Sequence, residues 1–154
     1  MTSEIATPND TKLSNDDIAT ILWAASGVNR PDGKRTAPAT HGMQYNNIYV
    51  ADYEGNYFYD AINNRLALRN KEMSKNKLSV QHHVAQSSHV IIITADLNRV
   101  PGLMSNREAK LKWANVTAGT IAQNIYLMCA DLHSFGVNIF YSQIRKFPTL
   151  KKAE

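Results

Sequence analysis

The sequence predicts a single domain of the α+β class. Three observations predict it: the chain has 154 residues, its middle alternates apolar and polar residues with a period of two, and segments on either side have the apolar spacing of helices. A chain of this length fits one domain of ordinary size, and a hydrophobic content of 44% is enough to form a core. We expect residues 1–12 to form a flexible arm and residues 13–154 to form the domain.

The first helix is predicted over residues 15–26. Ser14 is the expected N-cap, with Asp17 three residues later as its capping-box partner. Gly27 is expected to end the helix as the residue just beyond the C-cap. The apolar positions follow the helical spacing i, i+3, i+4, i+7: Ile18, Ile21, Leu22 and Ala25.

Residues 27–44 predict a long irregular connection, because they contain three glycines and two prolines. The tripeptide Pro31-Asp32-Gly33 has the composition of a turn. Long connections in compact domains are often functional. Between Arg35 and Gln44 this one offers backbone N–H groups, a hydroxyl, an amide and a cation, which suit the edge of a planar heterocycle or an anionic tail. The alternative is a surface loop that only crosses from helix to sheet.

An antiparallel meander is predicted over residues 47–68, where short β-rich runs alternate with turn residues. The expected strands are residues 48–51, 57–59 and 65–68, with turns at residues 54–56 and 60–64. Residues 69–79 are polar and rich in lysine, which predicts a loop or short helix, and residues 78–86 predict a further short helix. The β-branched run His89–Ala95 predicts a strand that is buried on both faces.

A long helix is predicted over residues 106–133, with Ser105 and Glu108 as its capping box. Much of its circumference is apolar, which is typical of a central, buried helix. Its small residues allow a neighbouring backbone to approach closely: Ala114, Ala118, Gly119 and Ala122.

Several other kinds of site are disfavoured by the composition. The net charge of +4 is thinly spread and forms no basic stripe. The net charge is therefore the one feature that favours the hypothesis of nucleic-acid binding. The single Cys129 excludes an internal disulfide and favours a reducing, cytoplasmic location. His82, His83 and His89 lack metal-ligand spacing, so we predict no metal site. The polar N-terminus and the short apolar runs predict no signal peptide and no membrane span.

Residues 21–38 read ILWAASGVNRPDGKRTAP. This segment resembles the nitroreductase family of FMN-dependent oxidoreductases, and it matches most strongly the short branch of that family that reads LLWAA.G.NRPDGKRTAPSA. The resemblance covers roughly residues 13–137 in the same order. Further matching segments are residues 47–50, 55–59, 64–66, 91–97 and 118–127.

The resemblance implies an α+β sandwich around a mostly antiparallel sheet flanked by helices, with residues 106–133 as a long central dimer-interface helix. It also implies an intertwined homodimer with FMN at its interface. The cofactor would take hydride from NAD(P)H and pass electrons to a nitroaromatic- or quinone-like acceptor, so no catalytic side chain is needed. The residues expected to bind FMN are Arg35, Thr36, Pro38, Ala39, Thr40, Gly42, Gln44, Thr117 and Gly119.

The sequence also departs from the family pattern. Ala39 stands where the family often has Ser, Gly42 where it often has Asn, and Thr117 where the short branch often has Asp. The arginine-rich motif RRSxRxF that grips the FMN phosphate is not found before Ser14. Phe140-Tyr141 occupy the place of an expected Arg-Gly, and a closing VGYP strand is not found. The alternative is a shortened nitroreductase-like protein with weak or lost FMN binding and no enzymatic activity.

Overall fold

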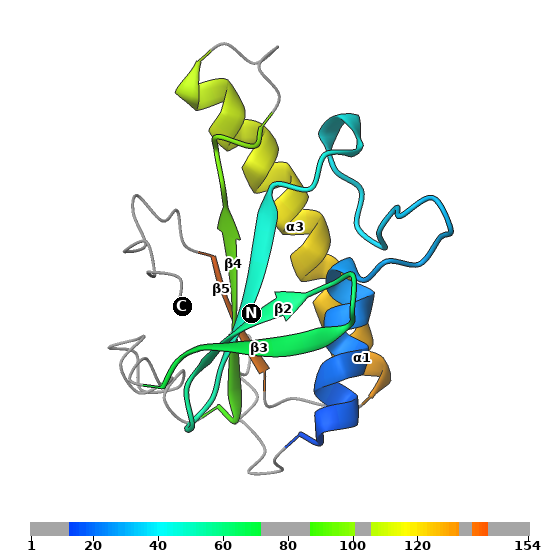
Figure 1. Ribbon diagram of the computed structural model, residues 1–154, viewed down its shortest axis with the longest axis vertical. Coiled ribbons are helices and arrows are strands. Elements are labelled where there is room, and N and C mark those ends of the chain that lie inside the picture. Colours follow the sequence, from blue (N-terminus) through cyan, green and yellow to red (C-terminus); the bar gives the residue numbers. More distant parts are fainter. Residues whose placement is uncertain (1–12, 72–86, 101–105, 133–136, 142–154) are drawn as a thin grey trace, which may run out of the picture.

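A computed structural model describes residues 13–71, 87–100, 106–132 and 137–141 (Figure 1). The predicted arm at residues 1–12 and the predicted short helix at residues 78–86 lie outside these ranges. The elements, in chain order, are α1 (Asn15–Ser26), η1 (Thr40–Gly42), β1 (Asn46–Ala51), β2 (Asn56–Asp60), β3 (Arg65–Asn70), β4 (His89–Ala95), α3 (Arg107–Asp131) and β5 (Val137–Tyr141).

The strands form one sheet in the order β3-β2-β1-β4-β5. β1, β2 and β3 form the predicted antiparallel meander, and β4 lies antiparallel to β1 on its other side. Only β5 is parallel to its neighbour, β4. The prediction of an α+β fold with a mostly antiparallel sheet is therefore confirmed.

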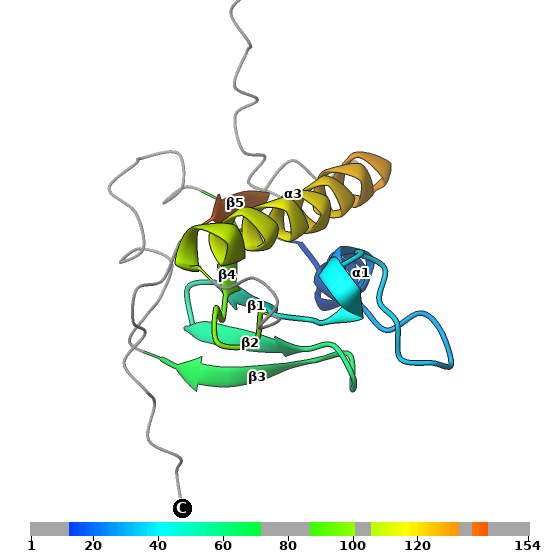
Figure 2. The same cartoon turned by 90° about the horizontal axis from the view of Figure 1, so that it is seen from above.

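Both helices pack against the same face of the sheet and against each other (Figure 2). β1 and β4 supply Ile48, Val50, Ile91 and Ile93 to this core. The opposite face of β4 is also buried, because Val90 and Ile92 pack with Ala51 of β1. The helices complete the main core with Ile18, Ile21, Leu22 and Ala25 from α1, and Ala118, Ile121, Ile125 and Cys129 from α3.

The predicted bounds of α1 and its capping box are confirmed. The Ser14 hydroxyl oxygen accepts a hydrogen bond from the Asp17 N–H at 3.1 Å, and Asp17 Oδ2 accepts one from the Ser14 N–H at 3.1 Å. Gly27 ends α1 as predicted, but the prediction that it lies just beyond the C-cap was wrong. Gly27 is the C-cap in an extended conformation, with φ of −68°. A Cβ there would lie 2.5 Å from Trp23 Cδ1 and 2.6 Å from the Trp23 carbonyl oxygen, so glycine is required by close approach.

Several predicted boundaries need smaller corrections. β1 begins at Asn46 and not at residue 48, and α3 ends at Asp131 and not at residue 133. β2 begins at Asn56, which we had placed in a turn, and β3 continues past residue 68 to Asn70. The N-cap of α3 is Asn106 and not Ser105, because Asn106 Oδ1 accepts a hydrogen bond from the Ala109 N–H at 2.7 Å. β3 is longer than predicted because it continues to pair with β2 up to Asn70. Asn106 is the N-cap because it directly precedes Arg107, the first residue of the helix.

In the described chain α3, which the sequence predicts to be a central, buried helix, is buried on one face. One face packs into the core, whereas the opposite face is exposed to solvent. Val116 is 53% exposed and Leu127 is 61% exposed. The exposed large apolar side chains of α3 are Trp113, Val116, Tyr126 and Leu127. The apolar residues around much of the circumference of α3 therefore belong to two faces: one packs into the core, and the other is exposed to solvent.

The position of the α3 N-cap gives a stability prediction. Asn106→Ala removes the acceptor for the Ala109 N–H, so the free energy of unfolding should fall by about 1 kcal/mol. Asn106→Asp keeps an acceptor oxygen and is expected to preserve stability. Urea denaturation followed by circular dichroism measures both. A larger loss from Ser105→Ala than from Asn106→Ala would contradict the assignment.

Candidate functional site

The long connection between α1 and β1 folds back on itself before it reaches the sheet. The Gly33 N–H donates to the Arg30 carbonyl oxygen at 3.0 Å, which closes the predicted turn, and Gly33 has a positive φ of 77°. The Thr36 N–H then donates to the Gly27 carbonyl oxygen at 3.0 Å, and Val28 forms an isolated bridge with Arg35. The loop therefore brings Arg35 back to the C-terminal end of α1.

Two side chains fasten the returning segment to the last turn of α1. Arg35 Nη1 donates to Ser26 Oγ at 3.3 Å, and Thr36 Oγ1 donates to the Trp23 carbonyl oxygen at 3.3 Å. Arg35 is half-buried, and its pKa is lowered by that burial. The guanidinium therefore lies partly inside the protein, where its charge acts more strongly than on an open surface.

The segment from Pro38 to Gly42 forms a tight turn beside this arginine. The Gly42 N–H donates to the Ala39 carbonyl oxygen at 2.9 Å, and Pro38 is exposed. Gly42 and His41 both have left-handed backbone conformations, with φ of 69° and 55°. Glycine and asparagine are the residues that tolerate this conformation best, so the asparagine of the family pattern at position 42 would meet the same backbone requirement.

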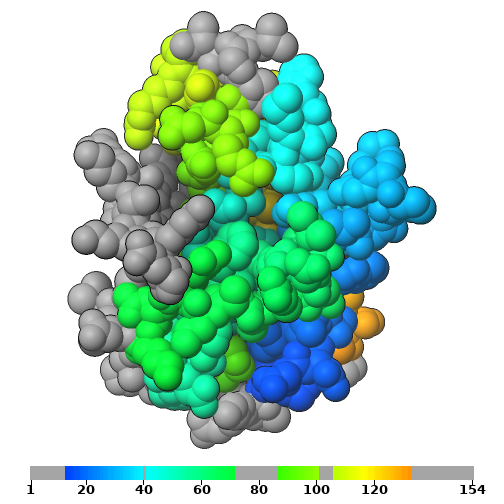
Figure 3. Space-filling view, in the orientation of Figure 1, coloured from blue at the N-terminus to red at the C-terminus, as the bar shows by residue number. Residues whose placement is uncertain are grey.

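A cavity of about 210 Å³ opens between this connection and the sheet. Arg35 and Gln44 are the two predicted binding residues that line it. Figure 3 shows the segments that supply its lining, the 27–44 connection in blue to cyan and the β2–β3 turn in green, next to each other on one face. The other lining residues are Asn46, Asn47, Ile48, Phe58, Tyr59, Asp60, Ala61, Ile62 and Arg99.

The residues that line the cavity include two arginines, Arg35 and Arg99, and one acidic residue, Asp60. The positive charge of Arg99 lowers the pKa of Arg35 further, after the larger effect of burial, while the negative charge of Asp60 raises it. Neither arginine has a carboxylate oxygen within 4.0 Å among the residues described. Two cations that share a cavity without an ion-pair partner favour an anionic ligand.

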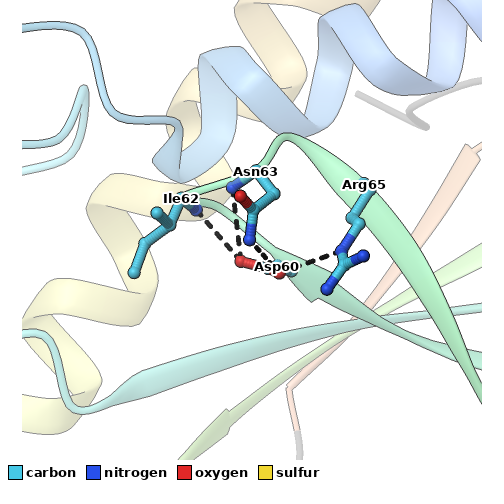
Figure 4. Close-up of polar contacts among 4 residues, drawn as sticks. All are labelled: Asp60, Ile62, Asn63 and Arg65. Carbon is cyan, nitrogen blue, oxygen red and sulfur yellow. Dashed lines mark hydrogen bonds and ion pairs between the residues drawn. The ribbon is translucent and has the colours of Figure 1, made fainter.

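The Asp60 carboxylate is engaged with its own turn (Figure 4). Oδ1 accepts hydrogen bonds from the N–H groups of Ile62 and Asn63, at 3.2 Å and 3.3 Å. Oδ2 accepts from Asn63 Nδ2 at 2.8 Å and from Arg65 Nε at 3.1 Å. These bonds hold the pKa of Asp60 below its usual range, with the Asn63 side chain as the largest cause. Asp60 therefore shapes the turn and does not pair directly with Arg35.

Asn46, one of the lining residues, carries a buried acceptor atom that has no partner in the described chain. It is 4% exposed, and its Nδ2 donates to the Ala114 carbonyl oxygen of α3 at 3.3 Å, which fixes the orientation of the amide. Asn46 Oδ1 has no hydrogen-bond partner. Asn56 Nδ2 is another unpaired buried atom in the described part of the chain, but Asn56 does not line the cavity. An unpaired buried acceptor costs about 1–3 kcal/mol unless a ligand or water satisfies it.

Tyr59 contributes a neutral phenol to the same wall. Its hydroxyl donates to Asn64 Oδ1 at 2.8 Å. Burial, as the largest cause, raises the pKa of Tyr59 to about 12. The phenol therefore stays protonated under physiological conditions and adds no negative charge beside the two arginines.

The two predicted site residues on α3 lie elsewhere. Thr117 is buried, and its hydroxyl is 2.9 Å from the Tyr45 hydroxyl, so it joins α3 to the end of the long connection. Gly119 lies on the exposed side of α3, and a Cβ there would meet nothing within 4 Å. The cavity therefore brings together two of the nine predicted residues. Thr36, Pro38, Ala39 and Gly42 belong to the same connection but do not line it, and Thr40 begins η1.

Sequence reasoning missed Asn46, Tyr59 and Arg99. Asn46 carried a usable signal, because it shares the alternation of Ile48 and Val50 and so puts an amide on the apolar face of β1. Arg99 follows β4 in a turn, where an arginine is ordinarily exposed, and only the fold shows that it reaches the cavity.

Other kinds of site find no support in the described residues. No group of three His, Cys, Asp or Glu side chains there could hold a metal ion. Cys129 is buried in the core, and burial raises the pKa of its thiol, which leaves it a poor nucleophile. None of the helices described is long and apolar enough to cross a membrane.

Comparison with known proteins identifies related sequences and folds. A model of the nitroreductase family matches residues 9–151. The solved structure of a candidate nitroreductase from Ralstonia eutropha has a TM-score of 0.72 and 29% identity, over 80% of this chain and 59% of that chain. No curated protein sequence gave a match.

A second solved structure shares the fold at lower identity. It is a chain of the E. coli microcin synthetase McbBCD complex with truncated pro-MccB17 bound, with a TM-score of 0.66 and 14% identity. The match covers 82% of this chain and 53% of that one. At this identity the likeness shows the fold alone, and this chain spans less than two thirds of both solved chains.

The Tyr45–Thr117 contact gives a test of what Thr117 does. Tyr45→Phe removes one hydroxyl from a buried pair, so the free energy of unfolding should fall by about 0.5–1.5 kcal/mol. Because Thr117→Val removes the other hydroxyl, the double variant should lose less than the sum of the two single losses. Urea denaturation of all four proteins measures this coupling, and strict additivity would contradict a direct interaction.

Proposed function

The chain belongs to the nitroreductase family, and from this premise we propose that it is an FMN-dependent oxidoreductase. It takes electrons from NAD(P)H and delivers them to a small nitroaromatic- or quinone-like acceptor. The observation that carries the proposal is the family-like segment from Arg35 to Gln44, whose two end residues line a polar cavity beside the sheet.

The chemistry of the cavity fits a flavin nucleotide. Arg35 offers a cation and Gln44 an amide, and both line the cavity. FMN carries both an anionic tail and a heterocycle edge with donors and acceptors. The cavity of about 210 Å³ is smaller than the roughly 300–1,000 Å³ of typical ligand pockets, so it holds one part of such a ligand. The turn from Pro38 to Gly42 would contact another part.

Bound FMN supplies the redox chemistry, and the protein supplies position and charge. The described residues that line the cavity include no thiol and no imidazole. Tyr59 stays protonated and adds no negative charge, so the cavity keeps its positive character across physiological pH. Positive charge at this site favours negatively charged ligands.

The exposed face of α3 supports a homodimer. Val116, Leu127 and Trp113 lie along one stripe of the helix and are exposed, as is Gly119 near them. Large apolar side chains that are exposed on one face of a helix favour an interaction site. A second copy of the chain packed along α3 would cover it, and the small Gly119 would let the two backbones approach closely.

A cytoplasmic location completes the proposal. The chain contains a single cysteine, Cys129, which the structure places in the core as a free thiol. A buried free thiol suits the reducing conditions under which NAD(P)H-dependent enzymes work.

The cofactor proposal is tested by the absorbance of the purified protein. After incubation with FMN and removal of the excess, the flavin band at about 450 nm should remain, and NADH or NADPH should bleach it under anaerobic conditions. Arg35→Gln should weaken FMN binding about tenfold or more, because it removes a charge-assisted contact. Arg30→Gln, at an exposed position in the turn, is the matched control and should bind normally.

The opposite result would favour the alternative function. A protein that stays colourless after incubation with FMN, at concentrations in the tens of micromolar, would contradict the oxidoreductase proposal. It would indicate a nitroreductase-like protein that has lost its cofactor.

The dimer proposal is tested by a charge on the exposed face of α3. Leu127→Glu places a carboxylate in the proposed interface, so light scattering should change from a dimer mass to a monomer mass. Tyr53→Glu is the matched control, because Tyr53 is exposed in the β1–β2 turn, away from α3, and this variant should remain dimeric. A monomer mass for the unmodified protein at micromolar concentration would contradict the proposal.

A further inference from the structure

Four aspartates among the described residues share one local geometry. In each of them, the side-chain Oδ1 accepts a hydrogen bond from the backbone N–H two residues later. Such a bond folds the carboxyl group over the peptide bond that joins the aspartate to the next residue. The four aspartates are Asp32, Asp52, Asp60 and Asp96, with distances of 3.2, 2.7, 3.2 and 3.0 Å. The residue that follows therefore decides how closely its nitrogen can approach the carboxyl carbon.

Asp32 is the member of this set that is followed by glycine. The residues that follow the other three are Tyr53, Ala61 and Leu97. Gly33 has a φ of 77°, and a Cβ at that position would meet nothing within 4 Å. Without a side chain, the Gly33 nitrogen is unshielded and its backbone turns with little restriction. The Asp32 side chain is 51% exposed, so water reaches the carboxyl group.

We propose that Asp32 is a site of spontaneous isoaspartate formation, and that Lys34 slows the reaction by holding the carboxylate. The Gly33 nitrogen attacks Asp32 Cγ, so that an N–Cγ bond forms and a Cγ–O bond breaks. The amide proton and the departing hydroxyl leave as water, and a succinimide ring remains. Water then opens the ring at either carbonyl carbon and gives aspartate or isoaspartate. One water is lost and one is regained, so no oxidant or other reagent is needed.

Two sets of contacts restrain the reaction in the folded protein. Asp32 Oδ2 lies 2.6 Å from Lys34 Nζ, and Asp32 Oδ1 accepts from the Lys34 N–H. These bonds hold the pKa of Asp32 below its usual range, with the Lys34 side chain as the largest cause. The carboxyl group must be protonated to lose water, so Lys34 disfavours the reactive form. The Gly33 N–H also donates to the Arg30 carbonyl oxygen at 3.0 Å, which holds the proton that must leave.

Isoaspartate at position 32 would change the path of the connection that carries Arg35. In isoaspartate the main chain runs through Cβ and Cγ, so the loop gains one backbone carbon. The loop is closed just outside this point, because the Asn29 N–H donates to the Lys34 carbonyl oxygen at 3.1 Å and Val28 forms a bridge with Arg35. A longer main chain disturbs this closure and shifts Arg35 in the cavity. An effect on FMN binding rests on the proposed function.

The test follows isoaspartate in the full chain during prolonged incubation at neutral pH, by peptide mapping with mass spectrometry and by labelling with an isoaspartyl methyltransferase. Isoaspartate should form at Asp32 about tenfold or more faster than at Asp60 or Asp96, because a side chain shields the attacking nitrogen at both controls. Lys34→Gln should raise the rate at Asp32 several-fold. Arg30→Gln removes an exposed positive charge from the same turn and should leave the rate unchanged.

Failure of this inference can be separated from failure of the proposed function. Equal rates at Asp32 and Asp60 would overturn the inference, and equal rates in Lys34→Gln and Arg30→Gln would overturn the role of Lys34. Asp32→Glu keeps a carboxylate but would need a larger ring, so this variant should form no isomer and should keep its FMN affinity on incubation. The unmodified protein should lose affinity as isoaspartate accumulates. If fresh protein binds no FMN but Asp32 still isomerises, the modification site stands and the cofactor proposal fails.

Discussion

The burial of β4 on both faces is the constraint on which the rest of the structure depends. Ile91 and Ile93 face the helices, while Val90 and Ile92 pack on the opposite side of the sheet. Each fully buried side chain of this size contributes about 1.5–3 kcal/mol of transfer free energy. Because β4 pairs with both β1 and β5, its position fixes the order of the sheet and the face on which α1 and α3 lie.

The cavity depends on where β1 begins, and two adjacent residues determine this. Tyr45 and Asn46 both form hydrogen bonds with α3, through Thr117 and the Ala114 carbonyl oxygen. The Tyr45 carbonyl oxygen also accepts from the Asp96 N–H at 2.9 Å, which joins the turn after β4 to the same point. The end of the long connection and the turn that carries Arg99 are thus held against one helix, and the cavity lies between them.

Elements with strong local signals were predictable from the sequence. The capping box at Ser14 and Asp17 and the run His89–Ala95 gave bounds that the structure confirms. The N-cap of α3 was missed because Ser105 and Asn106 are both good caps, and only the backbone geometry distinguishes them. Only part of the cavity lining was predictable. Arg35 and Gln44 lie within one sequence motif, which the sequence analysis identified. Asn46, Tyr59 and Arg99 come close to them only through the folding of the sheet and its turns.

The residues that line the cavity include polar groups whose environment is unfavourable in the free protein and would be improved by a bound ligand. A buried amide oxygen without a partner is unfavourable in a protein, and so is a half-buried guanidinium without a carboxylate, so sequences usually avoid both. Asn46 and Arg35, the residues that carry these groups, both line the cavity of about 210 Å³, beside a turn with two left-handed residues, His41 and Gly42. Stability alone would favour an apolar residue at position 46, on the same face of β1 as Ile48 and Val50. The coincidence of these unfavourable features is better explained by selection for binding than by selection for folding.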